Sequence, residues 1–256
     1  MNLLKKFLLE LQDVTNLIIS AFLGLLKSPH YFRETIQQMD LIGVGSLPIV
    51  LLTGFFTGGV LILQTYPTLV YYGAQAEAGR AVATSLIREL GPVLSALMVS
   101  GRIGSAISAE LGSMVVSQQI DAMRALGTDP NRKLVAPRIV ALILMLPLLT
   151  VAADVFGLLG GGIVAKNLFG LDYNLFINSV RNGITSEDIL GGAIKPLFFG
   201  LIIGSISCFK GLNTTGGTVG VGRSTTNAVV VSSITVIIFD FFLSRALQSI
   251  LDIKPF

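Results

Sequence analysis

Three charged side chains stand inside long apolar stretches of the sequence: Arg102, Asp154 and Asp240. If these stretches cross a membrane, an unpaired charge near the centre costs about 2.5 to 3.5 kcal/mol on insertion scales, so each charge needs a partner or water. We expect Arg102 to pair with Asp240 or with Asp154, because Glu110 of the same helix is rotated away from it by about 80°. Snorkelling of Arg102 into a water-filled cavity is the alternative. A proton relay is less favoured, since an arginine stays charged and cannot shuttle protons.

A second charged pair, Arg88 and Glu89, directly precedes an apolar run that begins at Leu90. A cation beside an anion at headgroup depth could recognise a zwitterionic or anionic lipid head. The alternative is that the two charges only anchor the end of the helix at the membrane interface. The sequence leaves both interpretations open.

Residue types that support covalent catalysis or metal binding are scarce. The chain has one cysteine, Cys208, and one histidine, His30, which excludes a disulfide, a zinc cluster and a Cys–His pair within the chain. No nucleophile has a general base beside it, so we predict no catalytic residue and no metal site. Residues 217–224 nearly match a phosphate-binding loop, but Arg223 takes the place of the lysine and an apolar run replaces the preceding strand. We therefore expect this chain to bind no nucleotide or other cofactor.

The composition indicates what kind of element positions these side chains. Of the 256 residues, 52% are hydrophobic and only 13% are charged, about half of the usual charged share of roughly 25%. Such a chain cannot cover itself with a soluble surface, so we predict an all-α integral membrane protein. The formal net charge of +3 is small and its cations are dispersed, which excludes a nucleic-acid-binding protein.

Five runs are apolar and long enough to cross a bilayer as helices. They cover about residues 41–66, 90–116, 139–165, 191–209 and 229–251, and we expect an irregular exit from the first run at Tyr66-Pro67. Residues 1–28 carry apolar side chains at steps of three and four, which predicts an amphipathic helix lying in the membrane interface; a first transmembrane helix is the alternative. Residues 29–256 then form one membrane domain, whose odd number of spans argues against equal inverted repeats.

Lysine and arginine residues collect in the N-terminal segment, between the second and third runs, and in the Gly/Thr/Ser-rich segment 211–227 that follows the fourth run. Cytoplasmic loops carry an excess of such residues. We therefore infer a cytoplasmic N-terminus and an exoplasmic C-terminus.

Between the second and third runs, residues 118–126 predict a short helix with Ile120, Met123 and Leu126 on one face. Gly127 ends this helix at the expected position, and Asp129 begins the next helix as its N-cap. An apolar ridge on the cytoplasmic side could dock onto a partner. A loop that rests on the membrane is an equally good interpretation.

Small residues dominate two neighbouring rows of the second run. The rows are Ser100, Gly104, Ser108 and Gly112, and Gly101, Ser105, Ala109 and Ser113. Small side chains let helices approach closely in lipid. The rows therefore predict a tight seam with a second subunit or another span, or packing inside one subunit.

Several stretches together resemble one family. They are Glu89–Pro92 (E-L-G-P), Gly101–Ala106 (G-R-I-G-S-A), Ala109–Met114 (A-E-L-G-S-M), Asp121–Pro130 (D-A-M-R-A-L-G-T-D-P), a block from Gly211 to Val229, and Asp240. In this combination the chain is similar to the MlaE-type (YrbE-like) permeases of ABC lipid transporters. The resemblance covers most of the chain and is far more specific than any single motif.

The resemblance implies a transporter membrane subunit rather than an enzyme. It would work as a homodimer with two cytoplasmic ABC ATPase subunits, which bind the ATP and magnesium, and with an MCE-domain lipid-binding protein. The substrate would be a phospholipid or a related glycerolipid. The membrane would be a bacterial inner membrane or a plastid inner envelope, with the N-terminus cytoplasmic or stromal.

The resemblance also implies roles for individual residues. The short helix between the second and third spans would couple the chain to the ATPase, through Gln119, Ile120, Asp121, Met123, Arg124 and Leu126. Glu110 would brace the end of the second span. Arg88 and Glu89 would border a lipid cavity between two subunits, and Leu61 and Leu69 would contribute to its apolar wall.

Two other classes of function remain as alternatives. A secondary carrier or channel would use Arg102, Asp154 and Asp240 as an ion path and would act alone in liposomes. A structural membrane scaffold would assemble without bound lipid. A permease should instead copurify with an ATPase.

Overall fold

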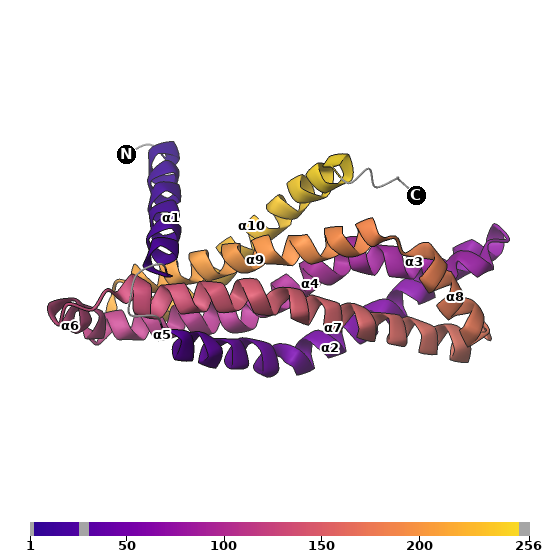
Figure 1. The fold of residues 1–256 in the computed structure, drawn as a ribbon, viewed down its shortest axis with the longest axis horizontal. Helices are drawn as coiled ribbons and strands as arrows, with labels where there is room; N and C mark the ends of the chain where they lie inside the picture. Colours follow the sequence, from indigo (N-terminus) through magenta and orange to yellow (C-terminus); the bar gives the residue numbers. More distant parts are fainter. Residues whose placement is uncertain (1–2, 26–30, 251–256) are drawn as a thin grey trace. The chain divides into compact units, whose positions relative to one another are not determined.

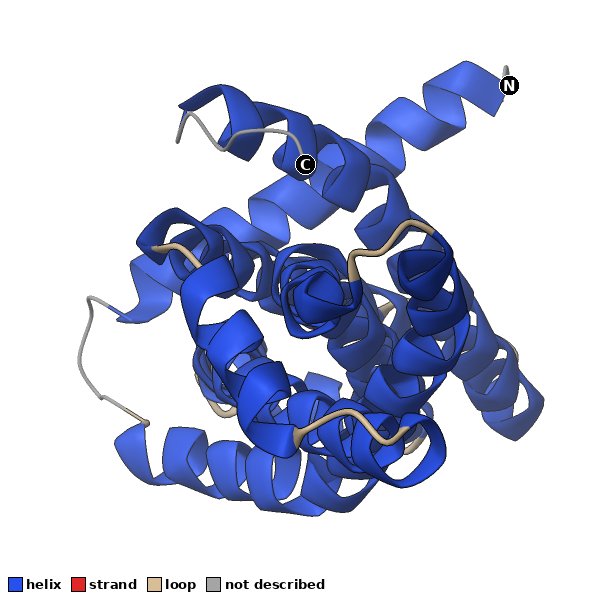
Figure 2. Cartoon of the chain, turned by 90° about the vertical axis from the view of Figure 1, so that its right-hand side faces the viewer, coloured by secondary structure: helices blue, strands red, loops and turns tan. Residues whose placement is uncertain are grey.

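The computed structural model describes residues 3–25 and 31–250, and every regular element in these ranges is a helix (Figure 2). The α-helices, labelled as in Figure 1, are α1 (Leu3–Leu25), α2 (Phe32–Tyr71), α3 (Ala78–Ser85), α4 (Gly91–Val99), α5 (Ser105–Val116), α6 (Gln119–Ala125), α7 (Ala136–Phe169), α8 (Tyr173–Gly183), α9 (Ser186–Leu212) and α10 (Gly217–Ile250). Three π-helical turns (Leu86–Leu90, Ser100–Gly104 and Asn131–Val135) and a 3₁₀ turn (Gln75–Glu77) join some of them.

Five helical stretches of the described residues are long and apolar enough to cross a membrane. They are Phe32–Tyr71, Gln75–Val116, Asn131–Phe169, Ser186–Leu212 and Gly217–Ile250. This confirms the predicted all-α integral membrane fold. The N-terminal helix α1 is not one of the five, and its position in the membrane interface stays a prediction; residues 1–2, 26–28 and 251 of the predicted segments lie outside the described residues.

The helices are longer than the apolar runs that predicted them. With 40 residues, α2 is about 60 Å long, twice the roughly 30 Å of hydrocarbon in a bilayer. The predicted irregular exit at Pro67 is wrong, because α2 continues through Pro67 to Tyr71. The segment after the fourth span is also more regular than predicted, since α10 already begins at Gly217 and includes Arg223. Polar residues can extend a helix beyond the bilayer, so charge marks the end of the apolar run and not the end of the helix.

The chain forms two compact units, each made of three segments. Unit 1 is Met1–Val44, Val99–Met145 and Phe199–Val236, and unit 2 is Gly45–Met98, Leu146–Phe198 and Ile237–Phe256.

Small side chains and hydroxyl groups bring the helices of unit 1 together. A Cβ atom added to Gly104 of the second π turn would lie 2.9 Å from the Ser207 Oγ of α9. The hydroxyl groups of Ser100 and Ser232 lie 2.7 Å apart and join this turn to α10. The row Ser100, Gly104, Ser108 and Gly112 is buried. This first predicted row therefore packs inside one subunit.

The neighbouring row is less enclosed. Gly101 is exposed, and a Cβ atom there would meet no other atom within 4 Å. Ser113 is also exposed, and Ser105 and Ala109 are half-buried. This row leaves a surface of small residues, for which a seam with a second subunit stays a prediction.

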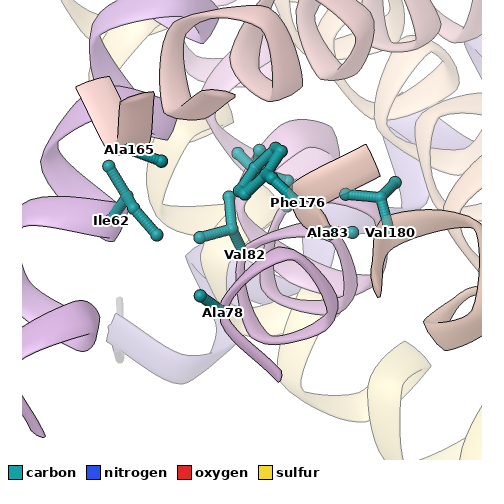
Figure 3. Packing of buried hydrophobic residues seen from close by; sticks show 8 residues of the cluster. Ile62, Ala78, Val82, Ala83, Ala165, Phe176 and Val180 are labelled. Carbon is teal, nitrogen blue, oxygen red and sulfur yellow. The ribbon is translucent and has the colours of Figure 1, made fainter. Parts of the chain in front are cut away.

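Unit 2 packs two amphipathic helices, α3 and α8, side by side (Figure 1). Phe176 of α8 is fully buried close to Val82 and Ala83 of α3, with Ile62 of α2 in the same cluster (Figure 3). Gly79 permits this contact, because a Cβ atom there would overlap the Phe176 carbonyl oxygen. The pair α3 and α8 therefore forms a buried apolar contact in unit 2.

Glycines also set the contact between α2 and α7 in unit 2. A Cβ atom on Gly58 would overlap the Gly157 carbonyl oxygen, and one on Gly160 would overlap the Phe55 carbonyl oxygen. Backbones can approach this closely in a membrane protein only where side chains are missing. The backbone contact holds α2 against α7, and other residues of α2 line an apolar groove.

Candidate lipid groove and coupling helix

An apolar groove of about 770 Å³ runs along α2 in unit 2. Eight of its lining residues come from α2 and one, Leu90, comes from the first π turn: Pro48, Ile49, Leu52, Thr53, Phe56, Thr57, Val60, Leu61 and Leu90. The volume lies within the range of about 300 to 1,000 Å³ found for small-molecule sites. Several wall residues, among them Leu52 and Phe56, are exposed in the single chain. The groove therefore offers an open apolar surface.

The groove includes only part of the predicted cavity wall. Both Leu61 and Leu69 pack against the buried cluster around Phe176, but only Leu61 also lines the groove. Phe56 and Thr57 supply much of the remaining wall, beside the glycines that contact α7. The role of this surface in lipid binding stays a prediction.

The ammonium group of Lys195 organises a charged network next to Leu90. Lys195 is almost fully buried, and its Nζ donates to Glu89 Oε2 at 2.7 Å, to the Arg88 carbonyl at 2.6 Å and to Ser244 Oγ at 2.8 Å. The Asp240 carboxylate lies 3.2 Å from the same Nζ. We call Arg88, Glu89, Asp188, Lys195, Asp240 and Ser244 the lysine network. A buried ammonium group is tolerated here because carboxylate, carbonyl and hydroxyl oxygens replace its water.

The π turn Leu86–Leu90 presents both Arg88 and Glu89 to this network. Arg88 Nε donates to the carboxylate of Asp188, whose side chain is fully buried, and Ser244 Oγ donates to Glu89 Oε2 at 3.0 Å. Insertions of this kind in helices occur frequently at functional sites. The Glu89 side chain remains 42% exposed. Arg88 and Glu89 are thus held in place by partners far along the chain, and the Glu89 carboxylate remains accessible.

Asp240 and Arg102, two of the charges within the apolar runs, each have a neighbour in the structure that the sequence does not predict. Asp240 has Lys195 as a cationic neighbour, a pairing that the sequence analysis did not weigh. Arg102 is exposed in unit 1, where its Nη1 lies 3.5 Å from the Leu41 carbonyl, while Asp154 and Asp240 belong to unit 2. The Arg102 pairing stays a prediction.

The predicted short helix is present as α6, Gln119–Ala125. Its C-terminus is closed as predicted, since Gly127 has φ +73°, its N–H donates to the Arg124 carbonyl and the Thr128 N–H donates to the Met123 carbonyl. Asp129 Oδ1 accepts from the Asn131 N–H at 2.9 Å, as expected of an N-cap. Gln118, with φ +59° directly before α6, and the closed C-terminus therefore separate α6 from the helices on either side.

Side chains of α6 divide into an inner and an outer set. Ile120 is buried and Met123 is half-buried, whereas Leu126 is 83% exposed. Arg124 and Asp121 form an exposed ion pair at 3.2 Å. Ile120 thus anchors the helix to its own chain, and Leu126, Arg124 and Asp121 remain available for a partner.

Sequence reasoning missed several residues of these sites. The sequence assigns no partner to Asp188, Lys195 or Arg138, and Arg138, which directly precedes the third apolar run, is buried in α7. Helix α8 was missed too, despite a readable signal: Asp172 caps it by accepting from the Asn174 N–H at 3.1 Å, and Phe176 and Val180 follow at helical spacing. Ion pairs that span about a hundred residues leave no such local signal.

Comparisons with known proteins agree with this architecture. A family model described as Permease MlaE matches residues 35–246. A probable ABC transporter permease protein of Synechocystis sp. is 44% identical over 88% of this chain and 85% of its own length.

Two further relatives have names that state a system or compartment. The Intermembrane phospholipid transport system permease protein MlaE of Haemophilus influenzae is 37% identical over 89% of this chain and 88% of its own. The protein TRIGALACTOSYLDIACYLGLYCEROL 1, chloroplastic, of Arabidopsis thaliana is 40% identical over 87% of this chain and 63% of its own.

Proposed function

The chain belongs to the MlaE permease family of ABC transporters, and from this premise we propose that it moves phospholipid or a related glycerolipid between membranes, driven by a separate ATPase subunit. The groove along α2 is the observation that carries the proposal. Its wall is apolar apart from two threonine hydroxyl groups and is open in the single chain. Acyl chains require such a surface, because they offer no group for hydrogen bonding.

The lysine network suits the polar end of the same lipid. Leu90 lines the groove, and the preceding residue, Glu89, keeps an exposed carboxylate beside a buried ammonium group. Fixed charges of both signs next to an apolar groove match an amphiphile with a charged head. We propose that Arg88 and Glu89 border the lipid site and that their partners hold them in position.

Energy would enter through α6. The glycine-rich residues that resemble a phosphate-binding loop lie within α10 from Gly217 onward, where amides beyond the first turn bond within the helix. An ATPase partner would therefore hold the ATP and magnesium. Its closure would press on Leu126 and Arg124, which α6 leaves exposed, and would move the helices that flank α6.

A complete transporter in this proposal contains two copies of the chain, two cytoplasmic ATPase subunits and an MCE-domain lipid-binding protein. The groove residues exposed on α2 would meet the second copy, so that two grooves form one cavity. The membrane would be a bacterial inner membrane or a plastid inner envelope, since one relative is named as the permease of an intermembrane phospholipid transport system and another as chloroplastic. The N-terminus would face the cytoplasm or stroma, as the distribution of lysine and arginine suggests.

Lipid retained by the purified complex tests this function. We would quantify phospholipids and glycerolipids by mass spectrometry after purification of the wild type, Leu52→Trp and Leu63→Trp. Leu52 lines the groove, whereas Leu63 is an exposed α2 residue that does not line it. An indole in the groove should lower retained lipid several-fold, and the Leu63 variant should match the wild type.

Equal lipid content in all three proteins would contradict the groove assignment. Purification without any lipid would favour a structural scaffold. Ion-driven activity of the chain alone in liposomes would favour the secondary carrier or channel.

A further inference from the structure

Two buried polar side chains of unit 2, Asp154 and Ser95, take no part in the proposed lipid site. Asp154 of α7 is 9% exposed and Ser95 of α4 is 2% exposed. Neither Asp154 Oδ1 nor Ser95 Oγ has a hydrogen-bond partner among the described residues. A buried polar atom without a partner is costly, and a buried carboxylate is especially so.

Both residues line one small cavity. Its volume is about 10 Å³, which is near the minimum of about 10 to 15 Å³ for one water molecule. Thr53 and Thr57 of α2 line it as well, and they also line the groove. The cavity therefore lies behind the wall of the groove and can hold one small particle.

A backbone carbonyl oxygen, that of Leu86, lies near the Asp154 carboxylate. Gly91 leaves room for the carboxylate, because a Cβ atom there would overlap Asp154 Oδ1 and would lie 3.0 Å from the Leu86 carbonyl oxygen. That carbonyl already accepts the Gly91 N–H across the π turn. A buried carboxylate oxygen that accepts no hydrogen bond needs a positive charge or a proton to stabilise it.

No positive side chain lines the cavity among the described residues. The α2, α4 and α7 residues that form it are uncharged apart from Asp154. The nearest charges on the π turn are Arg88 and Glu89, and these are bound to Asp188 and Lys195. The missing positive charge must come from solution.

We propose that Asp154 and Ser95 form a buried site for a single monovalent cation, either a proton or a sodium ion, behind the wall of the lipid groove. The carboxylate supplies the charge. The Ser95 hydroxyl, which makes no hydrogen bond to the carboxylate as placed, supplies a further oxygen ligand or, after a side-chain rotation, accepts the hydrogen bond of the protonated carboxyl group. The cation joins α7 to α4 beside the α2 residues Thr53 and Thr57. Occupancy therefore stabilises this face of the groove.

Thermal unfolding of the full chain in lipid nanodiscs tests the site without any transport assay. Sodium chloride is exchanged for choline chloride at constant pH and ionic strength, and in a second series the pH is varied between about 8 and about 6 in choline alone. Occupancy of the site should raise the Tm of the wild type by about 2 to 4 °C. If sodium binds, the Tm should be higher in sodium chloride than in choline chloride. If a proton binds, the Tm in choline should rise as the pH is lowered.

Asp154→Asn should remove this dependence, since the amide needs no counter-charge. Asp40→Asn, which removes an exposed carboxylate of α2, should keep it. An Asp154→Asn protein with the same sodium and pH dependence as the wild type would overturn the proposal. A wild-type Tm that responds to neither sodium nor pH would also overturn the proposal.

Chemical labelling keeps the proposal testable if Asp154→Asn does not fold. Dicyclohexylcarbodiimide reacts with protonated carboxyl groups in apolar surroundings, and peptide mass spectrometry locates the product. In wild-type protein without sodium at about pH 6, Asp154 should be modified, and sodium or higher pH should protect it. Equal modification under all conditions would refute the site, and because lipid is not measured, that result would leave the lipid function untouched.

Discussion

Arg138 Nη2 lies 2.8 Å from Glu110 Oε1, so the helix that leads into α6 is tied to the helix that leaves it. The Arg138 side chain is 3% exposed and the Glu110 side chain is 58% exposed. Arg138 Nη1 also donates to the Leu134 carbonyl at 3.1 Å. This ion pair bridges α5 and α7 on either side of the proposed coupling helix.

Glu110→Gln should lower the stability of the chain by about 1 to 3 kcal/mol, because it removes the counter-charge of a buried guanidinium group. Glu77→Gln provides the control, since Glu77 and Arg80 form an exposed pair at 3.6 Å worth less than about 1 kcal/mol. Thermal unfolding of both variants in the same detergent measures the difference. Equal Tm values would show that the Glu110 pair does not hold α5 to α7.

Arg124→Glu and Met123→Asp should abolish ATP-driven lipid movement while leaving insertion into the membrane intact. Arg124 is exposed and its ion pair with Asp121 is a surface pair, so the reversal costs less than about 1 kcal/mol in stability. Arg33→Glu, an exposed reversal on α2, is the matched control. Membrane fractionation and lipid transfer are measured on the same preparations; a transporter that retains its ATP-dependent rate with either α6 variant would show that α6 does not couple the subunits.

Lys195→Met should destabilise unit 2 by about 3 kcal/mol. This value is the lower end of the range for a broken buried ion pair, because the Glu89 side chain stays partly exposed to solvent. The substitution leaves Asp240 without its counter-charge and the Arg88 carbonyl without its donor. Lys166→Met, on an exposed position of α7, controls for loss of a charge. Denaturant unfolding followed by circular dichroism distinguishes the two, and unchanged stability of Lys195→Met would mean that the lysine network does not hold the π turn.

Gly58→Ala and Gly101→Ala separate close packing from helix propensity. Alanine favours a helix over glycine by about 1 kcal/mol, and at Gly101 its Cβ meets nothing within 4 Å. At Gly58 the same atom overlaps the Gly157 carbonyl oxygen. Gly101→Ala should therefore keep or raise the Tm and Gly58→Ala should lower it; the opposite order would contradict the backbone contact between α2 and α7. A Gly101→Ala chain that is stable but no longer dimerises would place the second subunit at this row.

The five spans could be predicted because uncharged runs leave a bilayer-length signal along the chain. Their ends could not, since α2 and α10 continue as helices through polar residues such as Arg33 and Arg223. The C-terminus of α6 and the start of the next helix were predictable, because Gly127 and Asp129 act on immediate neighbours.

The candidate site was only half predictable. Local sequence singled out Arg88 and Glu89, but their partners Asp188 and Lys195 lie far along the chain and depend on helix packing. Asp154 was singled out for its charge alone. Its Ser95 neighbour and the cavity between them emerge only when α4 and α7 meet.

Transfer of a labelled phospholipid by the reconstituted complex tests the central claim most directly. The complex contains the chain, its ATPase and its MCE-domain partner, and transfer is followed with and without ATP, and with an ion gradient alone. We predict transfer that requires ATP and the ATPase, and that falls several-fold in Leu52→Trp but not in Leu63→Trp. Lipid transfer by the chain alone under an ion gradient, or no transfer by the complete complex with ATP, would contradict the account.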